Sequence, residues 1–186
     1  MTETDERIRE VRATMNRIRT RTAQRSGIDR VVLREIRAQL VALARRTELF
    51  PHEEFPATGD DEQDTRLLHC EPDGSHALYL FSSDGDCETP PHDHGTWAVI
   101  VGIHGIELNR LYRRLGPDRF ELVREVAIGP GEGLCLMPDD IHAIASPGKA
   151  PLMHLHLYGQ AFEDQQRSVP IHADDGGAER TRETTG

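Results

Sequence analysis

Two histidines separated by one residue form the part of the chain best suited to hold a metal ion. They lie in the run Pro90-Pro91-His92-Asp93-His94. Residues two apart on a strand project to the same face, so His92 and His94 point one way and Asp93 the other. Two imidazoles on one face can share a metal ion at about 2.0–2.1 Å. This run therefore predicts two metal ligands.

A third ligand has to come from elsewhere in the chain, and His142 is placed to supply it. It ends the run Pro138-Asp139-Asp140-Ile141-His142, which follows a glycine-rich turn, a short strand and a second turn. This order puts His142 at the start of the next strand. The alternative is that the three histidines occupy unrelated loops and strand ends. We expect them to converge.

The chain that positions these histidines begins with two predicted helices. Apolar residues recur at helical spacing over about residues 4–24, which predicts an amphipathic helix. Asp29 is suited to cap a second helix that runs to about Arg46.

Short strand-like runs, separated by turns rich in Gly, Pro and Asp, follow Thr65. The runs are 66–70, 76–82, 97–103, 106–115, 120–127, 133–137, 142–145 and 152–158. This rhythm is typical of a double-sheet roll or barrel, the class that includes cupins. We expect an all-β cupin fold, a double-stranded β-helix or jelly-roll barrel with two N-terminal α-helices. We expect the chain to divide into three parts, which are a helical pair at 1–50, the barrel at 51–168 and a polar, disordered tail at 169–186.

A carboxylate that many cupins place in their first metal motif is absent. Its position falls on Ala98, whereas Gly105 keeps the glycine that ends that motif. The predicted site thus has three neutral ligands, and an Fe(II) ion held there keeps both positive charges, which favours an anionic thiolate. Zinc accepts the same three ligands, so the ligands alone leave the metal open.

At this point the sequence resembles the cysteine dioxygenase family of thiol dioxygenases, particularly its bacterial members, over roughly residues 64–167. The motifs that carry the resemblance are Pro90-Pro91-His92-Asp93-His94-Gly95-Thr96-Trp97, Pro138-Asp139-Asp140-Ile141-His142 and His154-Leu155-His156-Leu157-Tyr158-Gly159. The resemblance implies a mononuclear non-haem Fe(II) cofactor. It also implies the O₂-dependent conversion of a small thiol to its sulfinic acid.

The same resemblance assigns catalytic roles to His156 and Tyr158, which match the family's His-x-Tyr pair. The family has a serine where this chain has His154, so His154 belongs either to a different polar network or to an ordinary strand. Animal members carry a cysteine near the position of Ala98 that cross-links to the tyrosine. Ala98 excludes that cross-link here.

Two arginines are candidates for binding a substrate carboxylate, for which a bidentate guanidinium is well suited. Arg66 precedes His92 at the spacing found in the cysteine-type enzymes. Arg167 follows Tyr158 at a distance that resembles an active-site arginine of the mercaptopropionate enzymes. The substrate stays open among cysteine, 3-mercaptopropionate, mercaptosuccinate and larger thiols.

The composition of the chain indicates which classes of binding partner to expect. The net charge of −10 argues against nucleic acid as the main partner. The arginines are concentrated before residue 47, where they form either a solvated helix face or an RNA-binding arm. No run of about 18 apolar residues and no secretory signal is visible, so we expect no membrane partner. Three widely spaced cysteines fit a cytoplasmic location. The expected partners are a small thiol and O₂, and the expected state is a monomer or small homo-oligomer.

Two other functions compete with thiol oxidation. One is a metal-binding cupin that acts as a sensor or regulatory module without turnover. The other is a zinc or nickel cupin that catalyses isomerisation or hydrolysis, which would normally need a carboxylate base near the metal.

Overall fold

The computed structural model describes residues 3–57, 63–84, 87–117, 119–146 and 151–166. These residues form two α-helices, α1 (Glu3–Ala23) and α2 (Arg30–Ala44), short 3₁₀ turns, and eight strands. The strands are β1 (Gln63–Cys70), β2 (Ala77–Ser83), β3 (Ala98–His104), β4 (Glu107–Gly116), β5 (Arg119–Ile128), β6 (Gly133–Leu136), β7 (Ile141–Ala145) and β8 (Leu152–Tyr158). Arg167 and the predicted tail at 169–186 lie outside the described residues.

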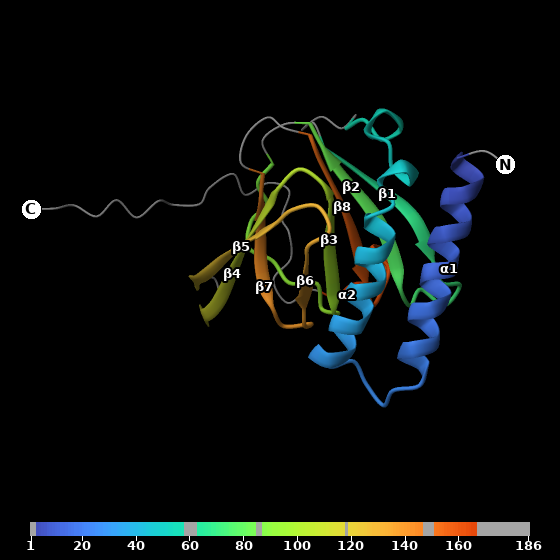
Figure 1. Ribbon diagram of the computed structural model, residues 1–186. Helices are drawn as coiled ribbons and strands as arrows, with labels where there is room; N and C mark the ends of the chain where they lie inside the picture. Colours follow the sequence, from blue (N-terminus) through green and yellow to red (C-terminus); the bar gives the residue numbers. More distant parts are fainter. Residues whose placement is uncertain (1–2, 58–62, 85–86, 118, 147–150, 167–186) are drawn as a thin grey trace, which may run out of the picture.

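The strands are arranged in two antiparallel sheets, with the helices on the outside of one of them (Figure 1). The larger sheet has the order β1-β2-β8-β3-β6, and the smaller has the order β5-β4-β7. The predicted double-sheet roll is therefore present, but within the described residues the strands do not close into one continuous barrel.

The segment before β3 shows why the sheets stay separate. This segment runs antiparallel to β7 through isolated bridges only, Glu88 to Ala145 and His92 to His142. Pro90 and Pro91 lie between these bridges and have no N–H to donate, so a continuous ladder cannot form there.

The side chains of the larger sheet alternate between two environments, as strand β8 shows most clearly. Leu155 and Leu157 face outward into an apolar cluster shared with α1 and α2. Because side chains alternate along a strand, His154 and His156 face inward, between the sheets, and Tyr158 lies in a second apolar cluster on that side. The interior therefore receives the polar side chains of β8.

The predicted helices are present within a few residues of their expected ends. Asp29 caps α2, since its Oδ1 accepts hydrogen bonds from the backbone N–H groups of Val31 and Val32, each at 2.8 Å. No described helix combines the length and apolar character that crossing a bilayer requires.

Gly105 turns the chain from β3 into β4 with a positive φ of 72°. A Cβ there would lie 2.5 Å from the carbonyl oxygen of Pro151, so only glycine fits. This turn sets the register in which β4 enters the space between the sheets.

Replacing Asp29 by alanine removes both capping hydrogen bonds of α2. We expect Asp29→Ala to lower the thermal midpoint by about 2–4 °C, measured by circular dichroism. Arg34→Ala, an exposed change on the same helix, is the control and should leave the midpoint within a degree. Equal midpoints for the two variants would show that the cap contributes nothing.

Candidate metal centre

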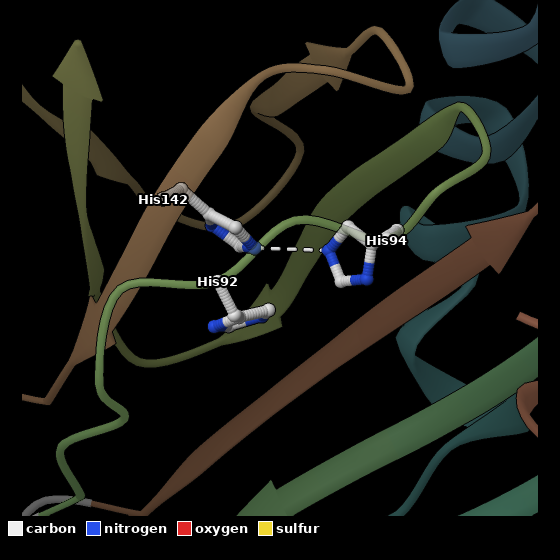
Figure 2. A group of neighbouring side chains, drawn as sticks. All are labelled: His92, His94 and His142. Carbon is white, nitrogen blue, oxygen red and sulfur yellow. Dashed lines mark hydrogen bonds between the residues drawn. The ribbon is translucent and has the colours of Figure 1, made fainter. Parts of the chain in front are cut away.

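The three predicted histidine ligands converge in the interior (Figure 2). His94 Nε2 and His142 Nε2 lie 3.0 Å apart, and one ring nitrogen of each histidine lies within 4.8 Å of the others. The residues are 2%, 3% and 0% exposed for His92, His94 and His142 respectively. Three buried imidazoles that point their nitrogens at one place form a candidate metal site.

His92 is held directly against His142. The backbone N–H of each donates to the carbonyl of the other, at 2.8 and 2.9 Å. The ring Nδ1 of His92 lies 2.9 Å from the carbonyl oxygen of Pro90, to which Nδ1–H donates. This contact selects the tautomer that leaves Nε2 as the metal-binding atom.

His94 lies in a turn rather than on the regular strand that the i, i+2 spacing predicted. The side chain of Asp93 accepts from the backbone N–H of Gly95, which has a φ of 62°. Strand β3 begins only at Ala98. Asp93 therefore stabilises the bend that follows His94 and is not grouped with the three imidazoles.

Asn109 on β4 orients the third ligand, and the sequence analysis did not find it. His142 Nδ1–H donates to Asn109 Oδ1 at 2.8 Å, and Asn109 Nδ2 donates to Glu107 Oε1 at 2.7 Å. Both β4 residues are completely buried. Because Nδ1 is engaged, His142 offers Nε2 to the centre. The only sign of this role in the sequence is that Glu107 and Asn109 are polar and two residues apart on a predicted strand. That spacing does not show which face of the strand lies in the interior.

Tyr158 and His156 form the pair that the sequence predicted. The Tyr158 hydroxyl lies 3.0 Å from His156 Nδ1, and both side chains are buried. The Tyr158 ring also packs beside His94, with ring centroids 4.7 Å apart. The pair thus adjoins the three imidazoles. Ala98 lies directly opposite Tyr158 across β3 and β8.

Glu107 also approaches two histidines of β8. Its Oε2 lies 3.5 Å from His154 Nδ1 and 3.7 Å from His156 Nε2. Burial lowers the pKa of His154 to about 4, so its ring is neutral at pH 7. Burial opposes ionisation of Glu107, but His154, His156 and Asn109 outweigh it and hold the pKa of Glu107 below its usual range. His154 thus lies beside the buried carboxylate of Glu107 without a hydrogen bond to it.

Arg66 is not brought to the histidines. It pairs in register with Leu80, so both face the helices rather than the interior. Its guanidinium bonds to Asp64 at 2.6 Å and to the carbonyl oxygens of Glu54 and Pro56. The proposed role in carboxylate binding finds no support in this geometry.

A surface cavity of about 460 Å³ is lined by Tyr112, Arg113, Arg114, Asp139 and Ile141. Ile141 points to the opposite face of β7 from its neighbour His142. This cavity is therefore not the entrance to the three histidines.

The donor atoms fit a divalent transition metal, since three imidazole nitrogens are a common ligand set for zinc and non-haem iron. The rings of His92 and His142 have oriented tautomers. Among the described residues, the carboxylate of Glu107 is separated from His142 by the side chain of Asn109. The centre is thus neutral apart from the ion that it would hold.

Comparisons with known proteins give the following. No protein-family model matches the chain, and no curated protein sequence matches it. Among solved structures, DMSP lyase DddQ from Ruegeria pomeroyi has a TM-score of 0.48 at 17% identity, over 67% of this chain and 60% of that one. The polyketide cyclase RemF from Streptomyces resistomycificus has a TM-score of 0.47 at 22% identity, over 61% of this chain and 75% of that one.

An oxalate oxidase in complex with glycolate has a TM-score of 0.45 at 12% identity, over 56% of this chain and 54% of that one. The chain thus spans about half the length of that enzyme. A cupin superfamily protein from Desulfitobacterium hafniense has a TM-score of 0.44 at 15% identity, over 62% of this chain and 88% of that one. At these scores the similarities assign neither a family nor an activity.

Removing the amide that orients His142 should weaken the metal centre. We expect Asn109→Ala to lower the affinity for Co²⁺ at the three histidines by about 10–100-fold, because His142 loses its fixed tautomer. The measurement is a titration followed by the Co²⁺ absorption bands that His142→Ala abolishes. Asn16→Ala, on the exposed face of α1, is the matched control. Unchanged affinity in Asn109→Ala would contradict an orienting role.

Proposed function

We propose that the protein is an iron-dependent thiol dioxygenase that converts a small thiol and O₂ to the sulfinic acid. One observation carries the proposal: three neutral imidazoles meet beside a hydrogen-bonded Tyr158–His156 pair. The histidine and tyrosine motifs that resemble cysteine dioxygenases in the sequence are thus neighbours in space. Ala98 also lies beside Tyr158, where the resemblance expects the cross-linking cysteine of animal enzymes.

The neutral ligand set favours a thiolate substrate. When bound, Fe(II) supplies the electronic activation that lets O₂ react with the sulfur. Since His92, His94 and His142 contribute no negative charge, the dication keeps its attraction for an anion. A nearby positive charge also lowers the pKa of a thiol, which raises the fraction present as thiolate at neutral pH.

Tyr158 and His156 hold a proton at the edge of the centre. When His156 Nδ1–H donates to the phenol oxygen, the phenol O–H can donate to another group, and the Tyr158 ring packs beside His94. From there the hydroxyl is suited to position the thiol or stabilise developing negative charge on oxygen.

The substrate is small, because the three ligands are at most 3% exposed. Cysteine and 3-mercaptopropionate are the substrates that the resemblance favours. Arg66 is engaged with Asp64 on the outer face, and Arg167 lies outside the described residues. Arg167 therefore stays the predicted partner of the substrate carboxylate.

Oxygen consumption tests the proposal. We expect the Fe(II)-loaded protein to take up O₂ when cysteine, 3-mercaptopropionate or mercaptosuccinate is added, and mass spectrometry to detect the product with two added oxygen atoms. His142→Ala is the matched inactive control, and His104→Ala, which removes an exposed histidine, should behave as wild type. No thiol-stimulated uptake with any of the three thiols would leave a metal-binding sensor without turnover as the better account.

A second test distinguishes the contribution of Tyr158 to catalysis from that of the metal. We expect Tyr158→Phe to lower kcat by about 100-fold because a positioned hydroxyl is lost, while the iron content stays at the wild-type level. Tyr79→Phe is the control, since Tyr79 packs against Tyr158 but its hydroxyl accepts from the backbone of Phe162. Equal activity in the two variants would remove Tyr158 from the catalytic machinery.

A further inference from the structure

A second cluster of ligand-type side chains lies in the same interior as the three histidines. Glu107 comes from β4, and His154 and His156 come from β8. One ligand atom of each lies within 4.8 Å of the others. Glu107 and His154 are 0% exposed, and His156 is 5% exposed. The cluster is thus buried between the two sheets.

Within this cluster, several polar atoms make no hydrogen bond to any described residue. They are Oε2 of Glu107, both ring nitrogens of His154, and Nε2 of His156. The approaches of 3.5 and 3.7 Å between Glu107 and the rings are attractive but too long for good hydrogen bonds. Buried polar atoms left without a hydrogen bond destabilise the folded state, so their convergence calls for an additional bonding partner.

We propose that Glu107, His154 and His156 form a second binding site for a divalent transition-metal ion. Two imidazoles and one carboxylate are a standard ligand set for iron, zinc and related metals. Two ligands that bond one ion at about 2.1 Å are separated by about 3.0–3.5 Å. The distances from Glu107 Oε2 to His154 Nδ1 and His156 Nε2 therefore need only a small contraction.

The neighbours of the cluster decide which atoms face the ion. Glu107 Oε1 is engaged by Asn109, which leaves Oε2. His156 Nδ1 is engaged by Tyr158, which leaves Nε2. For His154, Nδ1 is the atom close to Glu107. Two of the three residues thus use one atom to bind the protein and offer the other to the site.

The second site would be connected to the first through these same contacts. Glu107 reaches His142 through Asn109, and His156 reaches Tyr158 directly. An ion on His156 Nε2 would fix the proton on Nδ1, so that His156 always donates to the Tyr158 oxygen. The second metal would in this way set the orientation of the phenol beside His94.

Counting bound metal in the purified protein tests the site without any assay of activity. Metal-free protein is loaded with Co²⁺, freed of excess ion and analysed by mass spectrometry. We expect two equivalents in the wild type, one in His154→Gln and one in His142→Ala. His104→Gln, which removes an exposed histidine, should keep two equivalents. The count does not depend on thiol oxidation, so failure of the proposed reaction would leave this result intact.

An anomalous-scattering map of wild-type crystals soaked in Co²⁺ covers the case in which a variant fails to fold. We expect a peak within bonding distance of Glu107, His154 and His156, separate from a peak at the three histidines. One equivalent in the wild type with no peak at Glu107 would overturn the proposal, because a water molecule or a shared proton would then satisfy these atoms.

Discussion

The structure depends on bringing three neutral imidazoles together in the buried interior between the two sheets. A hydrogen bond on the outer nitrogen of a ring lowers the cost of burying it and fixes its tautomer. The carbonyl of Pro90 provides this for His92, and the side chain of Asn109 provides it for His142. The paired backbones of His92 and His142 then fix the separation between the segment before β3 and β7.

The same interior contains a continuous set of polar contacts, whereas the outer face of the large sheet is apolar. From His142 the contacts pass through Asn109 and Glu107 to His156 and Tyr158, which returns to the centre beside His94. The helices cover the opposite face of this sheet and exclude water from its back. A substitution in this polar set is therefore expected to act on several members at once.

Much of the fold and part of the site followed from local patterns. Helical periodicity, a capping Asp29 and turn-forming residues placed the elements within a few residues, because these signals act over short distances. The ligand trio was predictable because His92 and His94 are close in sequence. Asn109 was not, since its role depends on the register of β4 against β7. Arg66 had the expected spacing, but the pairing of β1 with β2 turns it to the other face.

The central claim is that one ion binds exactly three imidazole nitrogens and no carboxylate at the first centre. Extended X-ray absorption fine structure at the iron edge of His154→Gln protein, loaded anaerobically with one equivalent of Fe(II), tests this directly. That variant lacks one ligand of the second cluster but keeps the carboxylate of Glu107. We predict three imidazole scatterers at about 2.0–2.2 Å, with the remaining bonds to water. Fewer than three imidazoles, or the same spectrum in a variant that lacks His142, would contradict the account.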